Sequence, residues 1–577
     1  MTVVDDQVTH TFNVVNPTAD KYGEGSFSLA PRLESLEGKT LGLLWNAKAN
    51  GDTALKRAAE LISAKVPNLT VKFFNGHMPC APELLKQAAA ESDAIIACTA
   101  DCGSCSSWLT HDCIQIERMG VPTVIIASSG FEHDIHASAQ AFAMPTQQFV
   151  VVPSVYNHLT KEETISQTDP VVDDVLRLLT RRLTDAELAP DDDDAQASET
   201  FTADSELATF EAFNQVFHDR NWTDGYPVRP PTPARVARLM EGIDGSPTDV
   251  VCILPPGNGE ATVAKIAANA AMAGCHPEDM PVLMAALRAV AHKENDGPIR
   301  VCLMSTGAHA PLILVNGPIA KELGINGARC CLGPGKQNVV NTRIGRAFHM
   351  CLKNIARWVP GVMDLDSIGT ARKNVVVLTE NEDESPWEPY HVSQGYDPTD
   401  STVTVVFTAG EWDISLQGHV DGVQLAHAIG SVGVANNTGC SLGTFGQDLE
   451  SIPLGRMLLV PPPHAIPIAE AGFSKRQFEY FLWEKGVEPV GRLVEPMRKL
   501  YADGKTRKAY DWMFDLSREQ AWQQTSTVIE KPELYHVVVA GSVRAKDLLM
   551  PLRTLPETEL VTRTPQGADH REAQKSS

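Results

Sequence analysis

The sequence predicts an α/β protein: an N-terminal doubly wound parallel-sheet domain followed by two further α/β (or α+β) domains. Short apolar segments alternate with helical patterns between residues 39 and 152, which is typical of a parallel sheet covered by helices on both faces. The chain has 577 residues, and at roughly 100–200 residues per domain this length suggests about three domains.

The first domain is expected at 36–185, after a polar N-terminal arm at 1–35 that could add a strand. Its buried strands are predicted at 39–46, 69–74, 94–98, 121–127 and 149–152. Its helices are predicted at 52–65, 82–91 and 106–119, and Gly120 closes the last of them.

The remaining boundaries follow from changes in composition. An acidic linker is expected at 186–204, because Asp191–Asp194 repel one another and apolar residues are scarce there. A second α/β domain with Gly-rich loops is predicted at 205–397, and a third α/β domain at 398–555. The third domain should contain strands at 403–407, 457–460 and 536–540 and a helix at 474–485. A polar tail follows at 556–577.

Charge and composition restrict the possible partners. The formal net charge is −23, and so acidic a surface repels nucleic-acid phosphate and anionic membranes. No apolar stretch reaches the roughly 18 residues of a membrane span, and residues 1–29 lack a signal-peptide pattern. The 12 cysteines are scattered through the long chain, which is typical of free thiols in a reducing compartment and not of a disulfide framework. We therefore expect a cytoplasmic protein that acts on a small molecule and could form a homo-oligomer.

The chief chemical motif is Cys102-Gly103-Ser104-Cys105, between a predicted strand and a predicted helix. A C-x-x-C pair that opens a helix brings its sulfurs within disulfide reach. Free amides at a helix start stabilise a thiolate and can lower a cysteine pKa from about 8.5 towards roughly 3.5–7.5. Gly103 is expected to permit a tight turn. Ser106 and Ser107 are good helix-capping residues.

Two polar residues follow the next strand and are candidates for acid–base work. Consecutive strands are often neighbours, so Glu132 and His133 could face the cysteine loop and exchange a proton with a thiol or leaving group. The alternative is that both are surface residues that cap the next helix.

Two other interpretations of the cysteines remain open. Cys98, Cys102 and Cys105 have the C-x3-C-x2-C spacing of radical S-adenosylmethionine enzymes, which hold an iron–sulfur cluster. However, Cys98 ends an apolar strand, and an aromatic residue is missing before the third cysteine. The other interpretation is a transition metal held by Cys102, Cys105 and a histidine. The leading prediction includes no cofactor.

The motif and its flanks resemble the UGSC family, named for selenocysteine-Gly-Ser-Cys in some members and Cys-Gly-Ser-Cys in others. The matching residues are Asp101 to Trp108, His111-Asp112 and Gly120 to Val124. Downstream segments such as 224–228 and 385–389 are similar to proteins that carry this module. The resemblance implies redox chemistry, with Cys102 in the selenocysteine position and Cys105 as its resolving partner. It names no substrate.

Several polar residues could line a substrate site. They lie in or beside the cysteine loop and the Gly-rich loops of the second domain: Ser104, Ser106, Glu260, Asn316, Asn326 and Arg346. Amides and a guanidinium can fix a small polar ligand, although such residues also cap turns. Glu382 and Glu388, around Pro386-Trp387, could form a lid or a domain contact.

The sequence thus predicts a thiol-dependent oxidoreductase whose substrate lies in a cleft between the first two domains. Cys102 would be the nucleophilic thiolate and Cys105 the resolving thiol. Two alternatives stay open: a lyase or hydrolase that uses Cys102 covalently or a bound metal, and a redox- or metal-sensing binding protein.

Overall fold

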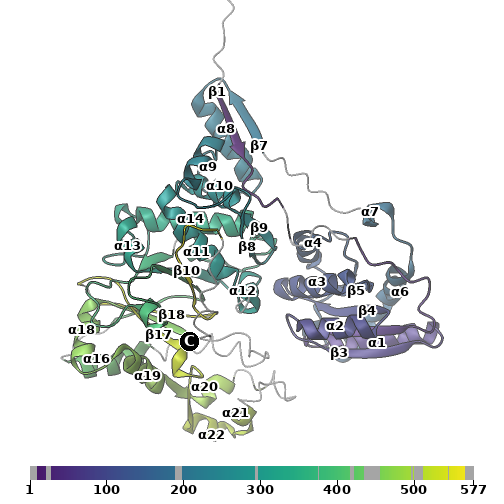
Figure 1. Ribbon diagram of the computed structural model, residues 1–577. Helices are drawn as coiled ribbons and strands as arrows, with labels where there is room; N and C mark the ends of the chain where they lie inside the picture. The colour runs from purple at the N-terminus through teal and green to yellow at the C-terminus, as the bar shows by residue number, and fades with distance from the viewer. Residues whose placement is uncertain are drawn as a thin grey trace, which may run out of the picture.

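The computed structural model describes residues 10–20, 22, 28–188, 198–292, 296–374, 376–415, 421–433, 455–495, 498, 511–543 and 545–565. Three sheets of four or five strands organise the described chain, together with three two-stranded sheets. Figure 1 shows the N-terminal sheet and its helices as one unit, beside a larger unit built from the rest of the chain.

The N-terminal domain is a five-stranded parallel sheet with strand order β3-β2-β4-β5-β6. Its strands are β2 (Thr40–Trp45), β3 (Thr70–Asn75), β4 (Ala94–Ala100), β5 (Thr123–Ser128) and β6 (Phe149–Val152). Its helices are α1 (Gly51–Lys65), α2 (Pro82–Glu91), α3 (Gly103–Arg118), α4 (Glu132–Ala141), α5 (Lys161–Thr168) and α6 (Val172–Thr180). One core cluster packs α1 and α6 on one face, and another packs α2, α3 and α4 on the opposite face. The predicted doubly wound fold is therefore confirmed.

The predicted strands and helices of this domain match within two residues, with one informative exception. Helix α3 begins at Gly103 rather than Ser106, because Cys102 caps it: its sulfur accepts a hydrogen bond from the Cys105 amide. Gly103 has no left-handed backbone, and a Cβ at this position would make only ordinary contacts, so the expectation that the tight turn requires glycine is wrong.

The second sheet is mixed and has the order β11-β10-β12-β19. Its strands are β10 (Ala310–Asn316), β11 (Val377–Thr379), β12 (Thr402–Thr408) and β19 (Glu557–Leu560). The core packs this sheet against α10 (Val263–Ala273), α11 (Met280–Val290) and α14 (Val339–Asn354). The structure thus differs from the predicted boundary at 397 and the predicted tail at 556, because β12 and β19 pair antiparallel within this sheet.

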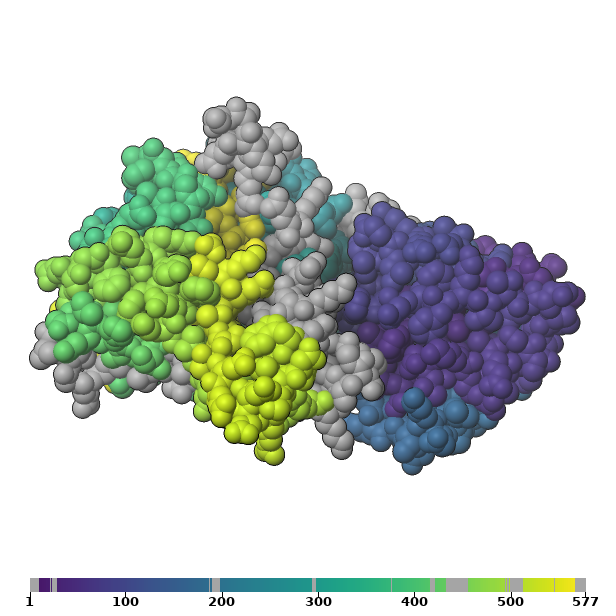
Figure 2. All heavy atoms as spheres, turned by 90° about the horizontal axis from the view of Figure 1, so that it is seen from below, coloured from purple at the N-terminus to yellow at the C-terminus, as the bar shows by residue number. Residues whose placement is uncertain are grey.

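The third sheet has the order β13-β18-β14-β17. Its strands are β13 (Trp412–Ile414), β14 (Arg456–Val460), β17 (Tyr535–Val539) and β18 (Asp547–Pro551). Helices α16 (Gly422–Ala428), α18 (Pro462–Glu470) and α19 (Lys475–Lys485) pack on it. The strands and the helix predicted for the third domain are therefore present, apart from β12, which lies in the second sheet. In Figure 2 the light-green part of this region lies at the left and the purple N-terminal domain at the right, while the yellow residues lie between them.

The shorter elements connect or flank these layers. The helices among them are α7 (Asp185–Leu188), α8 (Glu206–Asp219), α9 (Pro233–Met240), α12 (Asp296–Leu303), α13 (Pro318–Leu323), α15 (Tyr390–Ser393), α20 (Val490–Val494), α21 (Asp511–Asp515) and α22 (Arg518–Gln523). Two antiparallel pairs are β8 (Val250–Leu254) with β9 (Gly259–Thr262) and β15 (Val487–Pro489) with β16 (Thr525–Thr527). None of the helices that the structure describes combines the length and the apolar character that a bilayer span requires.

Strand β1 (His10–Val15) pairs antiparallel with β7 (Ser198–Ala203). These strands pack on α8, where Phe201, Phe213 and Phe217 form an aromatic cluster. The N-terminal arm therefore adds its strand outside the first domain, as Figure 1 shows. Part of the predicted linker is strand β7, while Asp191–Asp194 lie outside the described residues.

The N-terminal domain contacts the second domain through α3 and α4. An apolar cluster joins Trp108, Ile114 and Phe142 to Met304 and Met363. The Arg357 guanidinium donates hydrogen bonds to the backbone carbonyls of Gln140 and Ala141, at 2.7 and 3.3 Å. The amino end of α3 therefore faces the second domain.

Candidate functional site

The site begins at the carboxyl end of β4, where the pairing register with β5 shifts between Cys98 and Ala100. Asn46 follows the neighbouring strand β2 and holds this irregular segment. Its amide donates to the Thr99 carbonyl at 2.9 Å, and its side-chain oxygen accepts from the Thr99 amide at 3.0 Å. Bulges at strand ends redirect side chains near functional sites. This one directs the chain into Asp101 and Cys102.

Cys102 and Cys105 are joined by a disulfide bond. The two sulfurs differ in exposure, since Cys105 is 1% exposed whereas Cys102 is half-buried. The Cys105 amide donates to the Cys102 sulfur at 3.3 Å. A helix start with free amides stabilises negative charge on the capping atom. When the disulfide is reduced, Cys102 is therefore the more accessible sulfur and the one that the helix stabilises as a thiolate.

The serines of the loop have different surroundings. The Ser104 hydroxyl lies 3.8 Å from the Cys102 sulfur, within reach of a group bound there. Ser106 is buried and its hydroxyl donates to the Cys102 carbonyl at 2.7 Å. Ser107 accepts a hydrogen bond from Ser138 on α4. Ser106 therefore fixes the first turn of α3, and its contact with substrate stays a prediction.

Sequence reasoning missed a carboxylate beside the sulfurs. Asp101 is 3% exposed, and a carboxylate oxygen lies within 4.8 Å of both the Cys102 and the Cys105 sulfur. The Lys48 ammonium lies 3.5 Å from the Asp101 carboxylate. Burial raises the pKa of Asp101, and Lys48 opposes that shift. The signal was available: β2 and β4 are adjacent parallel strands, so residues just beyond their carboxyl ends meet.

The second domain covers the amino end of α3. A methyl group at position 103 would lie 3.6 Å from the Leu365 Cβ and 3.7 Å from the Thr306 Cγ2. The adjacent Asp366 forms an ion pair with Lys373 at 2.7 Å, and burial raises the pKa of Asp366. Side chains of the second domain thus lie next to the residue that follows Cys102.

The predicted acid–base residues on α4 make contacts elsewhere. The Glu132 carboxylate accepts a hydrogen bond from the Gly130 amide at 2.7 Å, so Glu132 caps the loop that precedes α4. The exposed His133 ring lies 3.1 Å from the Gly361 carbonyl in the second domain. Asp134 is the α4 carboxylate beside the loop, 3.9 Å from a methyl group built on Gly103. A catalytic role for Glu132 or His133 stays a prediction that these contacts do not support.

Three residues predicted to bind substrate lie in other surroundings. The Arg346 guanidinium makes two bonds with the Asp224 carboxylate, at 2.6 and 2.9 Å. The Asn326 amide donates to the Asn338 side chain and the Arg329 carbonyl, so it stabilises a turn. Glu260 lies in β9, opposite Ile253. The bonds of Arg346 and Asn326 are those of structural residues.

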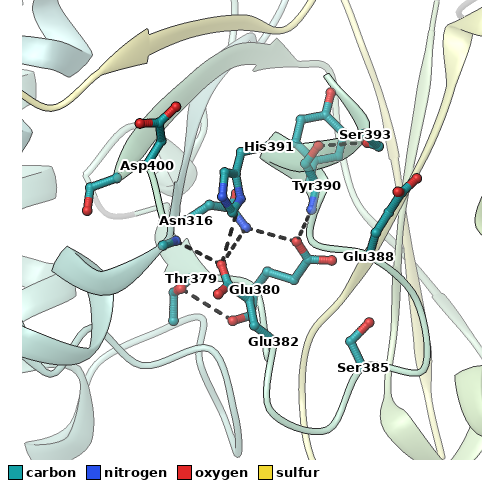
Figure 3. Close-up of polar contacts among 12 residues, drawn as sticks. Asn316, Thr379, Glu380, Glu382, Ser385, Glu388, Tyr390, His391, Ser393 and Asp400 are labelled. Carbon is teal, nitrogen blue, oxygen red and sulfur yellow. Dashed lines mark hydrogen bonds and ion pairs between the residues drawn. The ribbon is translucent and has the colours of Figure 1, made fainter. Parts of the chain in front are cut away.

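Asn316 belongs to a buried polar cluster at the carboxyl ends of β10 and β11 (Figure 3). Its amide donates to Glu380 at 2.9 Å and to Glu382 at 3.0 Å. The imidazole of the buried His391 lies 4.0 Å from Glu382. Glu380 also forms an ion pair with Lys475 at 3.3 Å. Because Lys475 lies on α19, this cluster connects the second and third sheets.

The segment around Trp387 makes the domain contact that the sequence allowed. The indole donates to the Phe473 carbonyl at 2.8 Å and stacks on Phe478. The neighbouring cysteines Cys330 and Cys331 differ in exposure, since Cys331 is buried but Cys330 is exposed. A left-handed backbone at Cys330 accompanies the turn that Asn338 caps.

The metal-based interpretations fit the geometry poorly. Cys98 is fully buried in the core cluster that packs against α1, and burial raises its pKa. A buried thiol with a raised pKa is a poor ligand for a three-thiolate cluster. Beside Cys102 and Cys105 the third candidate ligand among the described residues is Asp101, not a histidine. The ammonium of Lys48 would compete with a cation there.

Comparison with known proteins adds one finding. The UGSC family model matches residues 13–181, a span that contains the whole five-stranded sheet, its helices and the cysteine loop. No curated protein matches the chain.

Proposed function

Since residues 13–181 belong to the UGSC family, we propose that this domain carries out two-electron thiol chemistry on a small molecule. Cys102 is the attacking thiolate, and Cys105 resolves the adduct. The substrate presents an electrophilic sulfur, as a small-molecule disulfide does. The enzyme would therefore be a thiol-dependent oxidoreductase.

The difference in exposure between the two sulfurs is the observation that carries this proposal. A substrate can reach the half-buried Cys102, whereas Cys105 is closed off from solvent. The Cys105 amide stabilises charge on Cys102. An adduct on Cys102 then places its sulfur within bonding distance of Cys105, because the backbone already accommodates that disulfide. Burial therefore supports different roles for the two cysteines.

The neighbouring domain favours a small substrate. Leu365 and Thr306 lie next to Gly103, one of the two residues between the cysteines, so a protein surface would have to displace them. Nine further cysteines in the described part of the chain are free thiols. That redox state suits a reducing compartment such as the cytoplasm.

The test uses the reduced full-length chain, a chromogenic small-molecule disulfide and intact-mass measurement. The wild type should release two thiols and lose two hydrogens as the Cys102–Cys105 bond forms. Cys105→Ser should stop at a mixed disulfide on Cys102, and Cys102→Ser should lack rapid modification. Cys330→Ser, which removes an exposed free thiol, is the matched control and should behave as wild type.

Each contrary outcome has a clear meaning. Unchanged thiol release in Cys102→Ser, or a stable adduct on Cys105 in the wild type, would refute the assigned roles. If Cys105→Ser kept full turnover with its natural substrate, the enzyme would use Cys102 as a nucleophile without net redox, as in a lyase or hydrolase. A stoichiometric metal in elemental analysis of the reduced protein would instead support the metal-based alternative.

A further inference from the structure

The buried thiol of Cys105 has a proton to lose, and water is poorly placed to take it. Cys105 is 1% exposed, yet a thiol must become a thiolate to attack a disulfide. A resolving step at this position therefore needs a proton acceptor supplied by the protein.

Asp101 has the position that this acceptor requires. One of its carboxylate oxygens lies within 4.8 Å of both sulfurs, and neither oxygen makes a well-formed hydrogen bond. Resting on the proposed function, we infer that Asp101 is the proton carrier of the resolving step and that Lys48 is its positioning residue.

The groups around Asp101 are compatible with this role. Lys48, after β2, provides the nearest positive charge, 3.5 Å away. The His158 imidazole and the Asn157 amide face the carboxylate from the segment after β6. The Cys98 thiol lies on the strand that precedes Asp101, while Asp134 is beside Gly103 on α4. Burial is the largest influence and raises the pKa of Asp101, which makes its carboxylate a stronger base than an exposed one.

Atoms and electrons balance in the proposed reaction when a small-molecule disulfide is the oxidant. The Cys102 thiolate attacks one sulfur of R–S–S–R′, so that R′S⁻ leaves and Cys102–S–S–R forms. Asp101 takes the proton of Cys105 as the Cys105 sulfur attacks the Cys102 sulfur, and RS⁻ leaves. Asp101 then gives this proton to RS⁻. Two cysteines lose two electrons, and the substrate disulfide becomes two thiols.

The decisive experiment measures the two steps separately in Asp101→Asn. Stopped-flow absorbance with the chromogenic disulfide gives adduct formation on Cys102 and then thiol release by Cys105, across a range of pH. We expect the first rate to stay within about threefold of wild type. The second rate should fall roughly 10²- to 10⁴-fold, the range for loss of a positioned general base, and the mixed disulfide should accumulate by mass.

The pH profile distinguishes proton transfer from a structural effect. In wild type the resolving rate should rise with pH through the ionisation of Asp101, and this inflection should disappear in Asp101→Asn. Lys48→Met should shift the inflection to higher pH, because the cation that favours the ionised form is removed. Asp134→Asn, the neighbouring carboxylate, is the matched comparison and should keep the wild-type inflection.

The outcomes separate the two proposals. If the wild type never forms the Cys102–Cys105 bond with the disulfide probe, the proposed function fails. If the wild type forms it and Asp101→Asn resolves the adduct at the wild-type rate, only the role of Asp101 is refuted. Loss of the inflection in Asp134→Asn instead of Asp101→Asn would assign the proton to α4.

Discussion

Replacing Glu380 with glutamine tests how the second and third sheets are held together. Glu380 is buried and accepts four bonds: from Lys475 and the Val539 amide on one oxygen, and from Asn316 and the Tyr390 amide on the other. Every partner is a donor, so the NH₂ group of the introduced glutamine would lie opposite two donors and could accept a hydrogen bond from neither. Lys475, 3% exposed at its side chain, would lose its carboxylate.

The expected loss of stability follows from those contacts. Hydrogen bonds that involve a charged group contribute about 1.5–3 kcal/mol each, and breaking a buried ion pair costs about 3–5 kcal/mol. We therefore expect Glu380→Gln to lower local stability by about 3–5 kcal/mol. A change of about 1.4 kcal/mol corresponds to a factor of ten, so amide protection should fall by roughly 10²- to 4 × 10³-fold.

Hydrogen–deuterium exchange is the suitable assay, because a chain of several domains need not unfold in two states. Peptides that cover residues 377–393 and 535–541 report on both sides of the cluster. Glu388→Gln is the matched control: its side chain is exposed and makes none of the contacts drawn around Glu380 in Figure 3, and the expected change is within about 0.5 kcal/mol. Protection reduced less than tenfold in Glu380→Gln would refute the reasoning.

Three further predictions concern the N-terminal domain. Asp101→Asn should stabilise the protein at pH 7 but not at pH 3. Because burial raises the pKa of Asp101, wild-type stability falls as pH rises from the pKa in the unfolded chain, about 4, through the higher pKa in the folded protein. Equal melting-temperature differences at both pH values would contradict this. Asn46→Ala should cost about 2–4 kcal/mol, because two buried backbone groups of Thr99 lose their partner; denaturant unfolding measures it, and unchanged stability with an unchanged Cys102 modification rate would count against its positioning role. Met363→Ala should cost about 2–5 kcal/mol, because Met363 is buried in the cluster shared with α3 and α4; the exposed Met119→Ala is its control, and equal unfolding free energies would show that the cluster contributes little.

The central strands of the first sheet could be predicted closely because they are buried on both faces. Such strands are continuous apolar runs, and β4 and β5 contain no exposed position. The boundary between the later domains could not be predicted in this way. β12 is equally apolar, but its partners β10 and β19 are far away along the chain. Local sequence contains no signal for that antiparallel pairing.

The candidate site was predictable only in part. The spacing of Cys102 and Cys105 identified the sulfurs, because a C-x-x-C pair is a local pattern. Asp101 was noted only as the first residue of the matching motif, and Lys48 lies 53 positions earlier in the chain. Only the adjacency of β2 and β4 brings them together. For the side chains chosen from the Gly-rich loops, the sequence could not distinguish substrate binding from turn capping. Asn326 and Arg346 form hydrogen bonds within the protein.

The path of the chain explains how the N-terminal domain is held beside the second domain. β1 precedes this domain and β7 follows it, and the two strands pair over six residues from His10 opposite Ala203 to Val15 opposite Ser198. Both ends of the domain are therefore anchored at one place, next to α8. Arg357 and the apolar cluster around Met363 provide a second attachment, at α3 and α4. We infer that two separated attachments restrict rotation of the domain and so keep Leu365 and Thr306 next to Gly103.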